Sequence, residues 1–167
     1  PESILSRCAP LPSDAIGVLE RLFAQGTRVV AVAIRDADGL QAVGPDDERD
    51  LVLAGFLCFA DPPKAGAGAS LARLARLGVT VKIVTGDNGT VAEKVCADLG
   101  LPVAGILTGS EIDAMDDEGL RVAMPHTTIF ARVTPEQKSR IIRAQRTLGA
   151  DVGFLGDGVN DALALHD

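Results

Sequence analysis

Three short polar segments of this 167-residue chain carry residue types that phosphoryl transfer requires. The first is Thr85-Gly86-Asp87-Asn88, in which a hydroxyl stands beside a glycine whose amide no side chain covers. Such a pair can donate hydrogen bonds to a tetrahedral oxyanion. The same four residues also suit an ordinary turn in which Asp87 or Asn88 caps the next helix. The segment by itself leaves both interpretations open.

The second segment contains a lysine, Lys138, one turn into an expected helix that Thr134 and Pro135 open. The macrodipole disfavours a positive charge near a helix N-terminus, so this position suggests a neighbouring anion. A solvated lysine on the helix surface is the alternative interpretation.

The third segment, residues 156–161, reads GDGVND and places two carboxylates and an amide on a glycine turn. Asp157, Asn160 and Asp161 offer the oxygen ligands that Mg²⁺ prefers. The segment does not fit a dinucleotide fingerprint, because acidic groups would repel a pyrophosphate unless a metal intervened. A tight acidic turn that caps a helix is the alternative.

Composition indicates a globular, acidic chain. Apolar residues make up 47% of it and charged residues 23%, and the formal net charge is −7. No basic stripe is present, so we expect no nucleic-acid partner. The three cysteines are far apart and lack CxxC spacing, which favours neither disulfides nor zinc. The longest apolar runs, near 29–34 and 51–60, are too short to span a bilayer.

The elements expected around these segments fall into two groups separated by Asp61-Pro62-Pro63-Lys64, because consecutive prolines interrupt regular structure. Before the prolines we expect a helix capped by Ser13 and stopped by Gly26, then two strands joined by a polar loop. The strands are residues 27–35 and 51–60, and the loop is 36–50.

After the prolines, helices and strands alternate, which predicts an α/β fold with a Rossmann-like parallel sheet. A capping box of Thr134 and Gln137, with Pro135 at the first helical position, opens the helix that carries Lys138. The expected strands are 79–84, 127–131 and 151–155, the expected helices are 67–77, 89–99 and those beginning near 135 and 160, and weaker elements occupy 103–123.

The amino-acid sequences of these segments are similar to those of the P-type cation-transporting ATPases. TGDN at 85–88, FARVTPEQK at 130–138 and GDGVNDALAL at 156–165 resemble the phosphorylation domain of that family, which has a haloacid-dehalogenase-like fold. DPPK at 61–64 resembles the hinge that precedes this domain. GFLCFADPPK and GFLGDGVND are most similar to bacterial magnesium-importing members.

The resemblance implies a role for each matching residue. Thr85 and the backbone of Gly86 would hold the phosphoryl group, and Lys138 would neutralise its oxygens. Asp157 would bind the catalytic Mg²⁺, and the pair Asn160 and Asp161 would support the metal and the phosphoryl oxygens.

The resemblance also implies a domain organisation for the chain. Residues 1–60 would be the C-terminal part of a nucleotide-binding domain, 61–64 the hinge, and 65–167 the phosphorylation domain. Arg28, in the segment GTRVVAVA, would meet ATP, although a surface arginine that opens a strand is the alternative. Asp61 of the hinge and Asp87 would lie near the nucleotide.

Two departures from the family pattern matter. Leu163 stands where many members have proline, and no DKTGT string, which holds the phosphorylated aspartate, occurs in the chain. We therefore expect the chain to be an inactive cytoplasmic fragment of an ATP-driven cation transporter that forms an aspartyl-phosphate intermediate when intact. The transporter would reside in a bacterial inner membrane, carry magnesium, and depend on the rest of the same polypeptide.

Two other functions stay open on sequence grounds. A soluble haloacid-dehalogenase-like phosphatase would need a DxD nucleophile motif, for which Asp36-Ala37-Asp38 is a candidate within a predicted loop. A non-catalytic regulatory module would also lack the aspartate.

Overall fold

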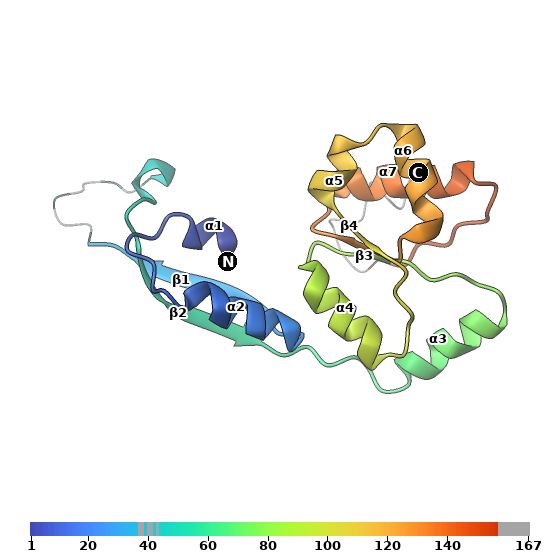
Figure 1. The fold of residues 1–167 in the computed structure, drawn as a ribbon, viewed down its shortest axis with the longest axis horizontal. Coiled ribbons are helices and arrows are strands. Elements are labelled where there is room, and N and C mark those ends of the chain that lie inside the picture. The colour runs from blue at the N-terminus through green and yellow to red at the C-terminus, as the bar shows by residue number, and fades with distance from the viewer. Residues whose placement is uncertain (37–38, 40–41, 43, 157–167) are drawn as a thin grey trace. The chain divides into compact units, whose positions relative to one another are not determined.

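The chain divides into two compact units, Pro1–Pro62 and Pro63–Asp167. The structure is a computed structural model that describes residues 1–36, 39, 42 and 44–156. The division between the units falls within the Asp61–Lys64 segment (Figure 1). The assignment of the two units to nucleotide binding and phosphorylation stays a prediction.

The first unit is a helix packed on a two-stranded antiparallel sheet. Strand β1 runs from Arg28 to Ile34 and pairs with β2, Val52–Phe59. Alternate residues of β1 turn to α2 and are buried, whereas the opposite face of the hairpin is exposed. The helical elements of this unit are α1 (Glu2–Leu5), α2 (Ala15–Ala24) and the 3-10 turn η1 (Pro45–Asp47).

The predicted start of α2 is wrong and its predicted end is right. Asp14, not Ser13, occupies the N-cap position, and no side chain caps the helix. The backbone of Asp14 is already helical, and Ala15 N–H donates to the carbonyl of Pro12, so the preceding turn leads directly into the helix. At the other end Gly26 has a φ of 76°, the left-handed conformation that stops a helix at low cost.

The second unit is a three-layer α/β structure. Its parallel sheet has the strand order β3-β5-β4, with β3 at Ile83–Val84, β4 at Ile106–Thr108 and β5 at Ile129–Ala131. The predicted α/β class with a parallel sheet is therefore confirmed. The helical elements are α3 (Ala67–Arg76), α4 (Gly89–Asp98), α5 (Gly109–Ala114), α6 (Asp117–Ala123), η2 (Met124–His126) and α7 (Pro135–Thr147).

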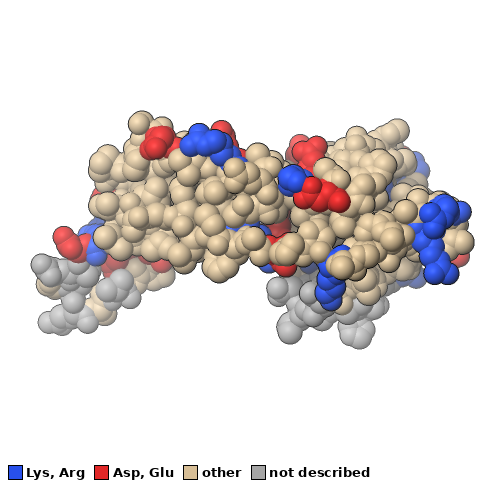
Figure 2. All heavy atoms as spheres, turned by 90° about the horizontal axis from the view of Figure 1, so that it is seen from below, with Lys and Arg blue, Asp and Glu red and all other residues tan. Residues whose placement is uncertain are grey.

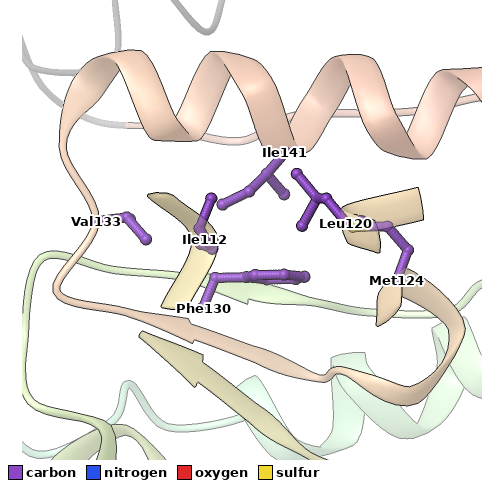
Figure 3. Close-up of a cluster of buried hydrophobic side chains, with 6 residues drawn as sticks. All are labelled: Ile112, Leu120, Met124, Phe130, Val133 and Ile141. Carbon is purple, nitrogen blue, oxygen red and sulfur yellow. The ribbon is translucent and has the colours of Figure 1, made fainter. Parts of the chain in front are cut away.

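Strand β5 is the centre of this unit because its side chains fill the core on both faces of the sheet. Phe130 is fully buried among residues of α5, α6 and α7 (Figure 3). Ile129 and Ala131 point to the other face, where they pack with Ala92 and Cys96 of α4. Since successive side chains of a strand alternate between faces, three residues are enough to join the two helical layers.

Two predicted strands of this unit need correction. The strand expected at 79–84 is confined to Ile83–Val84, and residues 151–155 form no strand. Strand β3 pairs only with β5, and within the described residues no strand pairs with its other edge. A strand at 151–155 would need a neighbour that offers its backbone groups, and Leu155 instead lies 99% exposed.

The predicted capping box of α7 is confirmed. The hydroxyl of Thr134 accepts a hydrogen bond from the Gln137 N–H at 3.3 Å, and the Gln137 side chain accepts one from the Thr134 N–H at 2.9 Å. Pro135 occupies the first turn, where its missing N–H costs nothing. The box fixes where α7 begins and therefore where Lys138 lies.

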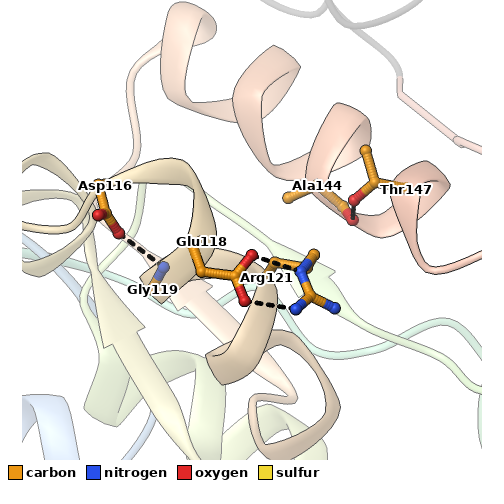
Figure 4. A network of polar contacts seen from close by, with 6 residues as sticks. All are labelled: Asp116, Glu118, Gly119, Arg121, Ala144 and Thr147. Atoms are coloured by element: carbon orange, nitrogen blue, oxygen red, sulfur yellow. Dashed lines mark hydrogen bonds and ion pairs between the residues drawn. The ribbon is translucent and has the colours of Figure 1, made fainter.

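Short-range polar contacts link surface residues within α6 and within α7 (Figure 4). Asp116 accepts a hydrogen bond from the Gly119 N–H at 2.7 Å and caps α6, while Arg121 pairs with Glu118 in a two-pronged contact. Thr147 bonds back to a carbonyl of its own helix. On the face drawn in Figure 2, acidic and basic side chains lie in small groups between uncharged residues. Every helix in the described part of the chain is too short or too polar to cross a bilayer.

Removing the cap hydroxyl should weaken α7. We expect Thr134→Ala to lower the free energy of unfolding by about 1 kcal/mol, because an N–H in the first turn loses its acceptor. Urea unfolding followed by circular dichroism measures the change. Thr147→Ala is the matched control, since its hydroxyl bonds to the Ala144 carbonyl at the far end of α7. Equal stability of the two variants would contradict the role of the cap.

Candidate phosphate-binding site

The loop that follows β3 is bonded to the connection between β5 and α7. Thr85 N–H donates to the Phe130 carbonyl at 2.9 Å, and Thr85 O accepts from the Val133 N–H at 3.2 Å. One step further, Asp87 O accepts from the Arg132 N–H at 3.0 Å. Sequence-distant segments at the carboxyl ends of two parallel strands are thus held side by side, where open α/β sheets bind ligands.

The first polar segment forms a tight turn of its own. Asp87 N–H donates to the Thr85 hydroxyl at 3.0 Å, and that hydroxyl donates to the Asp87 carboxylate at 3.3 Å. Asn88 caps α4 by accepting a hydrogen bond from the Thr90 N–H at 2.8 Å. The capping interpretation of this segment is therefore confirmed for Asn88. The cap uses the Asn88 side chain and leaves the phosphate-binding interpretation of Thr85 and Gly86 untested.

Gly86 is the open point of this turn. Gly86 is exposed, its φ is not in the left-handed region, and a Cβ added to it would meet no atom within 4 Å. The fold itself therefore does not require glycine at this position. A ligand that approaches the backbone closely would require it.

The start of α7 favours negative charge. Its exposed carboxylate, Glu136, has a lowered pKa because its own backbone N–H and then the Thr134 hydroxyl donate to it. Lys138 follows on the same turn and is partly buried, and its N–H donates to the Thr134 carbonyl at 3.0 Å. An anion near this end of α7 would meet a favourable helix dipole.

Two side chains that sequence reasoning did not single out for this purpose fix α7 against its neighbours. Gln137 is buried and donates to the Gly109 carbonyl at 3.0 Å, which ties the start of α7 to the start of α5. Arg140 donates to the carbonyls of Ile112 and Met115, each at 2.7 Å. These acceptors are backbone atoms, so no motif marks them; only the capping box pointed to Gln137.

The described structure does not test where the remaining predicted residues lie relative to this site. Asp157, Asn160 and Asp161 lie outside the described residues. Arg28, at the start of β1, and Asp61 belong to the unit Pro1–Pro62, where both are exposed. Their roles in ATP binding stay predictions.

A metal site is likewise untested. Among the residues that the structure describes, no group of three or more His, Cys, Asp or Glu side chains could hold a metal ion. The predicted Mg²⁺ ligands Asp157 and Asp161 both lie in the undescribed C-terminal segment. Their assignment therefore stays with the sequence resemblance.

The comparison with protein families agrees with the fold. Residues 15–167 match the model of the haloacid dehalogenase-like hydrolases. The chain belongs to this family.

The relatives narrow the class further. The chain is 45% identical over 147 residues to a magnesium-transporting P-type ATPase of Salmonella typhimurium, covering 86% of this chain and 16% of that protein. It is 44% identical over 154 residues to the corresponding Escherichia coli K12 protein, covering 89% and 17%. A probable cation-transporting ATPase F of Mycobacterium bovis is 37% identical over 170 residues, covering 93% and 18%. The predicted resemblance to P-type ATPases is confirmed, and the chain spans about one sixth of the length of these relatives.

Gly86 gives a test that separates folding from ligand binding. We expect Gly86→Ala to leave the unfolding midpoint unchanged, because the added methyl group meets no protein atom. It should weaken binding of inorganic phosphate in the presence of Mg²⁺, measured from amide chemical shifts by NMR. Gly153→Ala, at another position open to a methyl group, is the control and should change neither property. Unchanged phosphate binding by Gly86→Ala would argue against close approach of the anion to this backbone.

Proposed function

We propose that this chain is the phosphorylation-domain part, with the end of the nucleotide-binding part, of an ATP-driven P-type cation transporter. The observation that carries the proposal is the backbone pairing of the Thr85–Asp87 loop with Arg132 and Val133, directly before the helix that bears Lys138. The similarity to magnesium-transporting relatives supports magnesium as the cargo.

In the proposed reaction, the protein's aspartate attacks the γ-phosphorus of ATP, and the bond to the ADP oxygen breaks. The Thr85 hydroxyl turns its one hydrogen from the Asp87 carboxylate to a phosphoryl oxygen, and the Gly86 N–H donates to another. Lys138 offsets the negative charge of these oxygens. This is electrostatic stabilisation by preoriented donors, the main means by which proteins accelerate phosphoryl transfer. Water then releases phosphate from the aspartate.

Mg²⁺, when bound, would neutralise charge on the phosphoryl oxygens. Asp157 and Asp161 would hold it, and Asn160 would support the same oxygens. Arg28, Asp61 and Asp87 would contact or orient the nucleotide. The cargo cation would pass through membrane helices elsewhere in the polypeptide, with this region on the cytoplasmic side of a bacterial inner membrane.

The phosphorylated aspartate would come from the same polypeptide, since no DKTGT string occurs in the 167 residues. The edge of β3 that pairs with no strand of the described residues offers a place for the strand that carries it. Two hollows of about 430 and 140 Å³ border β3, one beside α7 and residues 150–154, the other beside α4. In the larger one, the buried Gln145 Oε1 has no hydrogen-bond partner within the described part of the chain. An extended segment could pair with β3 and supply a donor.

A soluble phosphatase is the weaker alternative. Asp36, the first residue of its candidate DxD motif, follows strand β1, and β1 pairs antiparallel with β2. The nucleophile of a haloacid-dehalogenase-like enzyme would instead be expected on the parallel sheet. Asp38 lies outside the described residues. Hydrolysis of p-nitrophenyl phosphate by the 167-residue chain, lost in Asp36→Ala, would favour this alternative.

The proposed roles can be tested on the intact transporter with radiolabelled ATP and Mg²⁺. We expect Asp157→Ala to abolish the acid-stable phosphoenzyme and Lys138→Ala to slow its formation about 100-fold or more, because one charged donor is lost. Lys94→Ala, which removes a surface lysine paired with Asp98 on α4, is the matched control.

The 167-residue chain supplies the second arm of this test. It should give no acid-stable label under the same conditions, because the phosphorylated aspartate is absent. Stoichiometric label on this chain would show that the nucleophile is misassigned. Near-normal phosphoenzyme in Lys138→Ala would contradict the role of that ammonium.

A further inference from the structure

A lysine that no motif includes connects the two strands that carry the phosphate-binding segments. Lys82 immediately precedes β3, and its Nζ donates to the carbonyls of Met124 and Thr127, each at 2.6 Å. These acceptors are 42 and 45 residues away in sequence. Met124 is the first residue of η2, the turn that leads into β5, and Thr127 directly follows this turn.

Both carbonyls lie where the α6–η2 helical segment ends, and the helix dipole at that end favours a cation. The Met124 carbonyl also accepts the Thr127 N–H at 3.3 Å, and the Lys82 ammonium is a second donor to it. Thr127 is itself buried, so water has little access to its backbone. The Lys82 ammonium therefore acts as a cap supplied by a different strand.

An ammonium is a costly choice at this position. Lys82 is partly buried and borders the 430 Å³ hollow together with Val84 and Ile141. Burial lowers the pKa of its ammonium, whereas two carbonyl acceptors favour the charged form. An apolar side chain would avoid the desolvation, but it could not fix the distance between β3 and the entry of β5.

That distance matters because only a short stretch of β3 pairs with β5. Their register consists of Ile83 opposite Ile129 and Val84 opposite Phe130. The Ile83 N–H bond to Thr128 O, at 2.8 Å, closes one end of this short pairing, and the Thr85 bonds close the other. A slip at the entry of β5 would displace Arg132 and Val133, which hold the loop.

We propose that Lys82 is a positioning residue for phosphate binding: by clamping the η2 turn to β3, it fixes the alignment of the Thr85–Asp87 loop with the start of α7. The part of this inference that concerns phosphate rests on the proposed function. The part that concerns alignment does not, because it follows from the hydrogen bonds alone. Each part has its own readout.

Amide hydrogen exchange of the 167-residue chain tests the alignment. In Lys82→Met, which keeps length but loses the donor, exchange of the Thr85 and Val133 amides should accelerate about tenfold or more, the scale of a lost charge-assisted bond. Amides within α4 should keep their wild-type rates. Lys82→Arg should restore slow exchange, since a guanidinium can also reach two carbonyls. Unchanged exchange in Lys82→Met would overturn the proposal.

Phosphate binding is the second readout. With inorganic phosphate and Mg²⁺ as the probe, Lys82→Met should shift the NMR titration to a several-fold higher concentration, and Lys82→Arg should return it towards the wild-type value. Lys94→Met, on the exposed face of α4, is the control. Weakened exchange protection with unchanged phosphate affinity would overturn the positioning role. Absence of phosphate binding by the wild-type chain would instead count against the proposed function.

A variant that fails to fold would still leave a test on the unaltered chain. In ¹⁵N-lysine-labelled protein, the Lys82 ammonium should give a slowly exchanging signal, because two carbonyls hold its protons. An ammonium that exchanges as fast as that of Lys94 would overturn the proposal.

Discussion

The short parallel pairing between β3 and β5 is the constraint on which the candidate site depends. Only two residue pairs define its register, yet the loop after β3 and the turn before α7 both take their positions from it. Phe130 of β5 stabilises the pairing because its side chain is fully buried against residues of the three helices α5, α6 and α7. The core and the site therefore share one strand, β5.

Around this pairing, polar contacts fix the parts that hydrophobic packing would leave free to slide. Gln137 and Arg140 hold α7 to the α5–α6 region, and Lys82 holds the entry of β5. All three side chains donate to backbone carbonyls, so they constrain main-chain positions directly. Such preorganisation suits a site that works by electrostatics, because its donors must be in place before charge develops.

Sequence reasoning succeeded where local chemistry decides structure. The α7 capping box follows from four consecutive residues, and the α/β class follows from the alternation of patterns after Lys64. It failed at residues 151–155, whose apolar pattern suits a strand but which have no strand beside them in the described chain. It could not find the Lys82 contact, because the partners are backbone carbonyls more than 40 residues away. The metal-binding roles of Asp157 and Asp161 remain predictions from resemblance.

The central claim is that the Thr85–Asp87 loop and the start of α7 form one phosphate-sized site. A crystal structure of the 167-residue chain with orthovanadate and Mg²⁺ tests it most directly. We predict that the anion lies within hydrogen-bonding distance of the Thr85 hydroxyl, the Gly86 N–H and the Lys138 ammonium together. An anion bound elsewhere, or these three groups directed to separate faces of the domain, would contradict it.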